Sequence, residues 1–177
     1  MTTNKETEVK PFSATNSDLE FFIRRCSIED LDGVIEVNEK ELPEDYPYFF
    51  YKSILDNFPE TFLIALDKNN NIIAYIMWRV EKTPSIDSLR YVNNGHLVSI
   101  AVSEKCRRRN VATKLLIESM SAIKKYKILQ YVLEVRVSNY SAIKLYEKLN
   151  YKIESIKKKY YRDGENAYFM VSNVKNT

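Results

Sequence analysis

The stretch from Val98 to Leu116 constrains the fold of this chain more than any other part of its sequence. An apolar strand pattern ends at Ser103, three arginines and an asparagine follow, and an amphipathic helix begins at Val111. The backbone N–H groups at a helix start lack intrahelical acceptors, and the helix dipole adds partial positive charge there. Arginines at such a place disfavour the helix unless they bind an anion, although a solvated turn is the simpler alternative. The pattern therefore predicts a site for a phosphorylated cofactor at the end of a buried strand.

Composition fits one folded domain. The chain is 45% hydrophobic and 12% aromatic, which excludes a wholly disordered protein. Its 27 basic and 24 acidic residues nearly balance, so a bulk polyanion-binding role has little support. We expect a tail without fixed structure at residues 1–19 and a single domain over 20–177.

The expected location is the cytoplasm. Cys26 and Cys106 make no disulfide framework, and the N-terminal residues carry no signal-peptide pattern. No apolar run reaches the length of a membrane span, so we expect no membrane association.

Hydrophobic periodicity predicts a mixed α/β (α+β) fold. Strands are expected at residues 21–25, 61–67, 72–81, 95–102, 129–137, 151–158 and 167–172. Helices are expected at residues 27–40, 48–57, 111–126 and 139–149, with a tight turn at 68–71 and a loop at 83–94. The strands at 95–102 and 129–137 are apolar on both faces, which is typical of the centre of a sheet.

Residues 107–112 read Arg-Arg-Arg-Asn-Val-Ala, which resembles the Arg/Gln-x-x-Gly-x-Gly/Ala signature of the GNAT superfamily of acetyl-CoA-dependent N-acyltransferases. The resemblance extends over roughly residues 22–170 and implies the GNAT fold, a single mixed sheet of about six to seven strands flanked by about four helices. It implies acetyl-CoA as cofactor, coenzyme A as product and no metal.

Asn110 stands where the family has glycine, and Asn tolerates positive φ better than other non-glycine residues. The cofactor-binding residues implied are Ile100, Ala101, Val102, Arg107, Arg108, Arg109, Asn110, Val111, Ala112 and Thr113.

A second block, residues 137–151, resembles the superfamily helix Asn-x-x-Ala-x-x-x-Tyr-x-x-x-Gly-Phe. Its spacing puts Asn139, Ala142, Tyr146 and Leu149 on one helical face. The resemblance implies that Asn139 binds the pantetheine and that Tyr146 meets the departing sulfur. A phenol with a pKa near 10 is a weaker acid than a thiol near 8.5, so Tyr146 would stabilise the thiolate by a hydrogen bond. Packing alone is the alternative role for this tyrosine.

Four further fragments, at residues 42–46, 95–96, 133–136 and 160–168, resemble NatA-type catalytic subunits, above all the archaeal single-chain enzymes, and the related RimI. Those enzymes acetylate protein N-termini, so the implied partners are peptide N-termini and the ribosome or its proteins. The implied substrate-binding residues are Leu42, Pro43, Glu44, Tyr46, Tyr160 and Tyr161. An α-amine with a pKa near 8 is deprotonated at neutral pH roughly 300-fold more often than a lysine near 10.4, which favours the α-amine as acceptor.

The candidate catalytic residues are His96, Glu134, Glu44 and Tyr146. His96, the only histidine, lies in an apolar strand, where a structural role is the alternative. Glu134 lies between apolar residues in mid-strand, and a buried carboxylate requires a partner. If the two strands are neighbours, each residue explains the other, and Glu44 is expected to join them. Such a cluster would orient a water and relay a proton from the amine. Which of the three accepts the proton stays open.

The basic residues allow other interpretations. The run Lys157–Lys159 is expected to be a solvated strand end, with attraction to the ribosome as the alternative. A nucleic-acid-binding module using this run, Arg107–Arg109 and Lys124–Lys127 would leave Asn139 and Tyr146 unexplained, and we expect no specific nucleic acid partner. A GNAT enzyme for lysine or small-molecule amines is the alternative activity.

Overall fold

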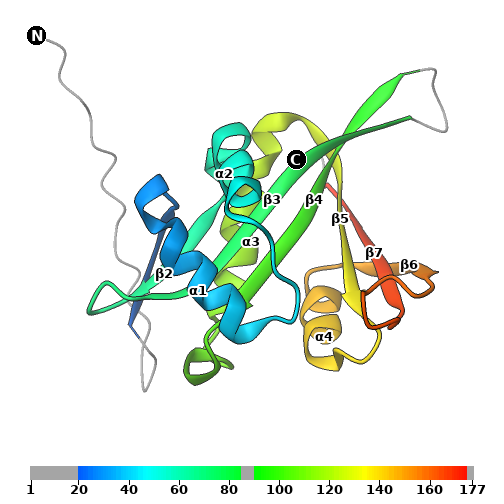
Figure 1. Cartoon of the computed structure of the whole chain (residues 1–177). Helices are drawn as coiled ribbons and strands as arrows, with labels where there is room; N and C mark the ends of the chain where they lie inside the picture. Colours follow the sequence, from blue (N-terminus) through cyan, green and yellow to red (C-terminus); the bar gives the residue numbers. More distant parts are fainter. Residues whose placement is uncertain (1–19, 85–89, 175–177) are drawn as a thin grey trace, which may run out of the picture.

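A computed structural model describes residues 20–84 and 90–174, so the tail predicted at 1–19 lies outside the described residues. Its strands form one seven-stranded sheet in the order β1-β2-β3-β4-β5-β7-β6 (Figure 1). They are β1 (Phe21–Arg25), β2 (Leu63–Asp67), β3 (Ile72–Pro84), β4 (Tyr91–Val102), β5 (Ile128–Arg136), β6 (Lys152–Lys157) and β7 (Ala167–Asn173). The α-helices in these ranges are α1 (Leu31–Glu41), α2 (Tyr48–Asn57), α3 (Val111–Ile123) and α4 (Tyr140–Lys148). The predicted mixed sheet with four flanking helices is confirmed.

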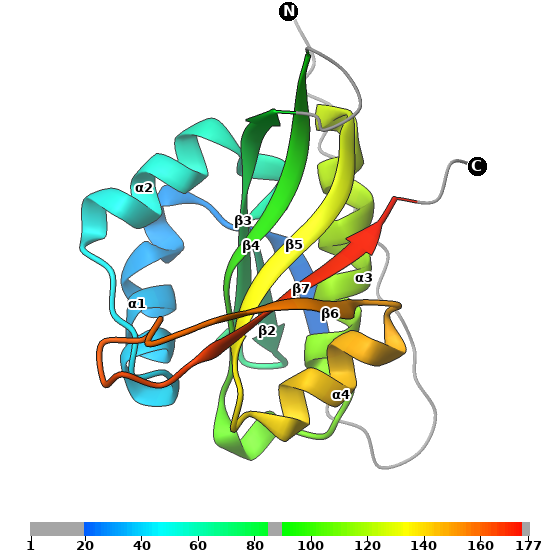
Figure 2. The same cartoon turned by 90° about the vertical axis from the view of Figure 1, so that its right-hand side faces the viewer.

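The sheet is buried on both faces. Figure 2 shows α1 and α2 on one face and α3 on the other. Along β3 the side chains alternate between two buried clusters, with Tyr75 and Met77 facing α1 and α2, and Ile76 and Trp78 facing α3. The indole Nε1 of Trp78 donates to Ser119 Oγ at 2.9 Å, which fixes α3 against the sheet.

The pair β4–β5 is parallel, whereas the other neighbouring strands are antiparallel. A parallel pair needs a long crossover, which α3 supplies, so the loop before α3 is carried to the end of β4. The last register pair between the two strands is His96 with Val132. Beyond it β4 runs on to Val102 and β5 to Arg136, and the strands diverge (Figure 1). This divergence places the ends of both strands around one site.

Local capping explains the first helix. Ser27 donates its backbone N–H and its hydroxyl to the carboxylate of Asp30 at 2.8 and 2.9 Å, so Asp30 satisfies a free donor at the start of the helix. The first turn, Ile28–Asp30, is a 3-10 turn, and α1 begins after it. None of the helices in the two described ranges is both long enough and apolar enough to span a bilayer.

Several predicted boundaries differ from the observed ones by a few residues, and two of the differences have a clear physical reason. The loop expected at 83–94 is shorter, because β3 extends to Pro84 and β4 starts at Tyr91, where polar residues still form a backbone ladder. Ladder hydrogen bonds join backbone groups and do not require apolar side chains. Thr61 belongs to a 3-10 turn ahead of β2, where its hydroxyl donates to the carbonyl of Phe58 at 2.9 Å.

Candidate active site

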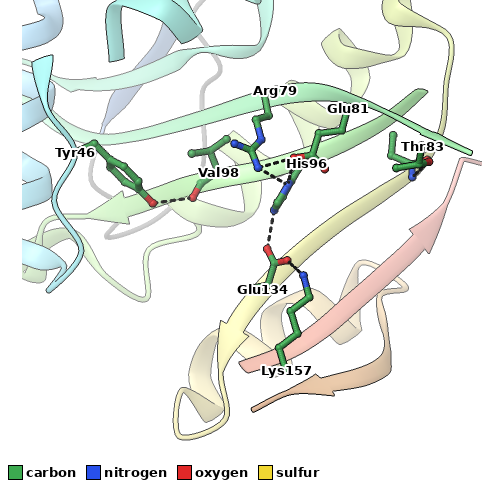
Figure 3. A network of polar contacts seen from close by, with 9 residues as sticks. Tyr46, Arg79, Glu81, Thr83, His96, Val98, Glu134 and Lys157 are labelled. Carbon is green, nitrogen blue, oxygen red and sulfur yellow. Dashed lines mark hydrogen bonds and ion pairs between the residues drawn. The ribbon is translucent and has the colours of Figure 1, made fainter. Parts of the chain in front are cut away.

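His96 and Glu134 face each other where β4 and β5 begin to diverge. The Nε2 atom of His96 is 2.6 Å from Glu134 Oε2, and Nδ1 is 2.8 Å from Glu81 Oε1 (Figure 3). The side chains of His96 and Glu134 are only 12% and 6% exposed. The contact that the sequence predicted between them is therefore present, and Glu81 is a second carboxylate that the sequence argument missed.

These residues belong to a row of five side chains of alternating charge, Arg79, Glu81, His96, Glu134 and Lys157, which we call the charge chain. Arg79 Nη2 is 2.5 Å from Glu81 Oε1, and the Lys157 ammonium contacts Glu134 Oε1. The row crosses the sheet from β3 to β6 (Figure 3). Opposite charges in contact offset the cost of burying each one.

The two carboxylates set the protonation of His96. Burial lowers its pKa, but hydrogen bonds and charges from Glu134 and Glu81 outweigh burial, and the net pKa is raised. Burial raises the pKa of Glu134, but His96 and Lys157 outweigh that effect and hold this pKa well below its usual range. With both ring nitrogens against carboxylates, the geometry favours an imidazolium that donates two hydrogen bonds. The two carboxylates thus stabilise the protonated form of His96, in line with its raised pKa.

A second ion-pair group, the Arg136 cluster, joins two loops and consists of Arg136, Glu44, Asp163 and Glu165. Arg136 donates from Nη2 and Nε to Glu44 Oε1 at 2.5 and 3.1 Å. Its Nη1 donates to Asp163 and to Glu165, each at 2.7 Å. The guanidinium also lies 4.0 Å from the ring centre of Tyr161.

The contact that we expected between Glu44 and His96 is absent. Its carboxylate pairs with Arg136 and not with His96 or Glu134. The forked guanidinium, two residues beyond Glu134 on β5, offers this loop carboxylate several donors. Glu44 therefore ties the loop at residues 42–46 to the loop at residues 160–165.

A hollow of about 490 Å³ lies beside these loops. It is lined by Pro43, Glu44, Asp45, Tyr46, Arg136, Arg162 and Asp163. Three of the predicted substrate residues thus line one cavity. Tyr46 also donates its hydroxyl to the carbonyl of Val98 at 3.5 Å, beyond the last β4–β5 pair. Leu42 packs into the core against α1 and α2 instead.

Tyr160 and Tyr161 are not among the residues that line the hollow. Their rings contact each other edge to face, 5.1 Å apart. Burial raises the pKa of Tyr160 to about 12, so its hydroxyl stays protonated near neutral pH. Arg162 and Asp163, which follow them directly, do line the hollow.

Asn38 anchors the loop that carries Glu44. This fully buried residue of α1 donates from Nδ2 to the carbonyl of Glu44 at 2.7 Å. Tyr75 of β3 donates its hydroxyl to Asn38 Oδ1 at 2.5 Å, and its oxygen lies 2.7 Å from Ser99 Oγ. The sequence did not predict this role of Asn38. A polar residue on an apolar helix face was the available signal.

The arginine-rich loop has the backbone that its sequence predicted. Asn110 has φ 61° and is the N-cap residue of α3. Arg108 also has a positive φ of 59°, which the sequence did not indicate. The side chains of Arg108 and Arg109 are exposed, and Val111 is buried beneath the helix start, with Ala112 and Thr113 half-buried in its first turn.

Arg107 is already engaged with protein groups. It pairs with Glu41 at the end of α1 and donates from Nε to the carbonyl of Val102 at 3.2 Å. Glu41 also accepts the backbone N–H of Glu104 at 3.0 Å. Nearby Cys106 is buried, and burial raises its pKa, so it is a poor nucleophile.

The second cofactor block starts with a cap. Asn139 is the N-cap residue of α4, and its Oδ1 accepts the backbone N–H of Ala142 at 3.1 Å. Asn139 therefore lies just before α4 and not on the helical face that the sequence predicted. Its side-chain oxygen instead binds a backbone N–H that has no acceptor within the helix. Tyr146 is 6% exposed, its ring centre is 5.7 Å from that of Tyr151, and burial raises its pKa above the ordinary value.

A model of the acetyltransferase (GNAT) family matches residues 27–151. The chain belongs to this family. This chain is 44% identical over 156 residues to the N-alpha-acetyltransferase of Saccharolobus solfataricus. The alignment covers 85% of this chain and 92% of the relative. The family and the fold expected from the motifs are thus confirmed.

Solved structures agree with the family. Ard1 from Thermoplasma volcanium superposes with a TM-score of 0.77 at 25% identity, covering 88% of this GNAT chain and 99% of its own. A chain of the NatB acetyltransferase complex bound to CoA and MES superposes with a TM-score of 0.75, also at 25% identity, covering 87% and 99%. Coenzyme A is therefore bound within a homologous structure.

Proposed function

We propose that this protein acetylates the α-amine at the N-terminus of proteins by direct transfer from acetyl-CoA within a ternary complex. The chain is an N-alpha-acetyltransferase, like the Saccharolobus protein to which it is 44% identical over 156 residues. The observation that carries the mechanism is the buried His96–Glu134 pair at the point where β4 and β5 diverge. The two loops tied by Arg136 border the same end of the sheet.

Acetyl-CoA is the proposed acetyl donor, and the loop at residues 107–113 is its pyrophosphate site. Free N–H groups at the start of α3 and the exposed Arg108 and Arg109 supply positive potential there. Arg107 fixes the loop to α1 through Glu41. The chain holds no covalent intermediate in this scheme, which agrees with the buried, poorly acidic Cys106.

The thioester end would lie along β4 beyond His96. There Ile100, Ala101 and Val102 have no β5 register partner, so those of their N–H groups that do not bond to β3 can bind the pantetheine arm and the oxyanion. Asn139 accepts a helix N–H through Oδ1, which leaves its amide nitrogen free to donate to pantetheine. The Tyr146 hydroxyl, kept protonated by its raised pKa, would donate to the thiolate that leaves.

His96 is the proposed proton acceptor for the amine. In its neutral form, with one ring nitrogen turned from its carboxylate to a water, it takes the proton through that water, and Glu134 and Glu81 stabilise the imidazolium that results. Glu134 is a poor acceptor because its pKa lies well below the usual range. Glu44, held by Arg136, positions the loop that borders the peptide.

Protein N-termini are the proposed acceptors. The backbone of the first peptide residues would lie between the loop at 42–46 and the Tyr160–Tyr161 pair, with the first side chain in the hollow lined by Pro43, Glu44 and Tyr46. Nascent chains at the ribosome in the cytoplasm supply such amines, and this setting is part of the proposal.

The test is incubation with acetyl-CoA and peptides that begin with Ser, Ala, Met-Leu or Met-Glu, followed by mass spectrometry. We expect acetyl groups on the α-amine only, at a rate that requires His96. Each peptide is matched by one with a blocked N-terminus and a free internal lysine, which we expect to stay unmodified. Acetylation confined to lysines or to free polyamines would instead establish the alternative GNAT activity.

A further inference from the structure

Lys157, the last residue of β6, does not behave as the solvated strand end that its sequence predicted. Its ammonium contacts Oε1 of Glu134, whose side chain is 6% exposed (Figure 3). The neighbouring Lys158 and Lys159 are exposed. One lysine of the run is therefore directed into the candidate site and two are not.

Strand register fixes the position of this ammonium. On β7, Phe169 is the register partner of Glu134 on one side and of Ser155 on the other. Lys157 lies two residues beyond Ser155, on the same face of β6, and its ammonium lies 4.6 Å from the centre of the Phe169 ring. The centre of the Tyr160 ring lies 5.5 Å from the same ammonium. Two aromatic rings and two strands hold the charge in place.

The two oxygens of Glu134 are divided between two cations. Oε2 faces His96 and Oε1 faces Lys157. Glu81 contacts the other ring nitrogen of His96, and its Oε1 atom contacts both His96 and Arg79. Two carboxylates alone would strongly favour an imidazolium, so each flanking cation weakens the hold of its carboxylate on the histidine proton.

We propose that Lys157 is a positioning residue that acts through Glu134 to keep His96 able to release its proton at neutral pH. The inference rests on the proposed function, in which neutral His96 accepts the proton of the amine. Lys157 itself contacts neither the thioester nor the amine in this scheme.

The charged and titratable groups around the histidine give the sign of the effect. They are Arg79 and Glu81 from β3, Glu134 from β5, Lys157 from β6, and the phenols Tyr46 and Tyr160 from the two loops. Both phenols have raised pKa values and are uncharged near neutral pH. Without the Lys157 charge, His96 is the only cation among the described residues in contact with Glu134. The carboxylate then stabilises the imidazolium more strongly, so the pKa of His96 must rise.

The first experiment reads the histidine directly. Because His96 is the only histidine in the chain, an NMR titration of the tag-free protein follows its ring signals without assignment. For Lys157→Met, which keeps the aliphatic contacts with Phe169, we expect the midpoint to rise by about half a unit to one unit. Lys157→Gln should rise similarly, and Lys157→Arg should restore the wild-type midpoint. Lys158→Met is the matched control and should titrate like wild type.

The second experiment is the pH profile of kcat/KM for an N-terminal peptide. In Lys157→Met the acid limb should move to higher pH by the same amount as the NMR midpoint, while activity above the limb stays near wild type. A merely structural loss would change KM without moving the limb.

The outcomes separate the two claims. If the His96 midpoint of both neutral variants overlays that of the folded wild type, the inference on Lys157 is overturned. If the NMR midpoint moves but the acid limb stays, Lys157 acts on His96 as proposed and the role of His96 as proton acceptor fails instead.

Discussion

The charge chain and the Arg136 cluster lie at the same end of the sheet and are built from the same kinds of residue, but different elements hold them. Every member of the charge chain is on a strand, from β3 to β6. In the Arg136 cluster only Arg136 is on a strand, and its three carboxylates come from loops. Glu134 is 6% exposed, whereas Asp163 is 58% exposed.

The difference separates two tasks. Strand-held charges cannot move apart without breaking the sheet, and the burial of His96 and Glu134 makes an unpaired charge there costly, so their geometry is fixed before any ligand arrives. The pairs of Arg136 are only partly buried and their carboxylates are carried by loops, so they can break and re-form as a peptide enters. The charge chain therefore suits proton transfer, and the Arg136 cluster suits closure of the peptide site.

Replacing the histidine should have the largest effect. We expect His96→Gln to lower kcat/KM by about 100-fold or more, because a general base contributes on the order of 10²–10⁴ in rate. The measurement is steady-state kinetics with an N-terminal peptide, with thermal unfolding as a check that the fold persists. A loss smaller than about threefold would remove His96 from the proton-transfer step.

The wild-type pH profile should follow from the same residue. The imidazolium cannot accept a proton, so kcat/KM should fall about tenfold per pH unit below the His96 pKa. That pKa is raised, so the limb should lie above the ordinary histidine value of about 6.5. In His96→Gln this limb should be absent. A limb near pH 4 in the wild type would point to a carboxylate instead.

Breaking the loop-held cluster should have a smaller and different effect. In Arg136→Met, three carboxylates lose their shared cation and repel one another, so the two loops should separate. We expect KM for the peptide to rise about tenfold while kcat changes less than about threefold, since binding rather than chemistry is affected. Arg25→Met, on the edge strand β1 far along the sheet, is the matched control. A fall in kcat with unchanged KM would show that the cluster belongs with the chemistry.

The smallest effect should come from the cofactor loop. At φ 61°, Asn110→Gly should change the free energy of unfolding by less than about 0.5 kcal/mol, because glycine adopts this conformation freely but loses more entropy. Asn110→Ala should lower it by about 1 kcal/mol, since a Cβ is strained in the left-handed region. Denaturant unfolding measures both. Equal stability of the two variants would mean that the loop backbone is free to change its turn.

Much of the fold and part of the candidate site could be predicted from the sequence. The bounds of β1 and α2 agree with the prediction to the residue, since their periodicity and flanking breakers are clear. The family, the fold and the N-alpha-acetyltransferase activity expected from the motifs are also confirmed. The pairing of His96 with Glu134 followed from the need of a buried carboxylate for a partner.

The contacts that could not be predicted depend on the register between strands that are distant in the sequence. Nothing near Lys157 distinguishes it from Lys158, and only the alignment of β6, β7 and β5 brings it to Glu134. The partner of Glu44 was also misjudged, because the three carboxylates that bind Arg136 lie 92, 27 and 29 residues from it along the chain. The individual roles of the site residues stay predictions, which the variants above test.

The divergence of β4 from β5 has a consequence for amide hydrogen exchange. Beyond His96, alternate backbone groups of β4 bond to β3, while those of residues such as Val98, whose carbonyl faces Tyr46, point away from it. In the free protein the amides of Val98 and Ile100 should exchange with solvent deuterium quickly, and those of their immediate neighbours slowly. Bound coenzyme A should slow the exchange of the Val98 and Ile100 amides to that of their neighbours. The exchange rates along this one strand would therefore show whether the cofactor site is occupied, without a chemical probe attached to the protein.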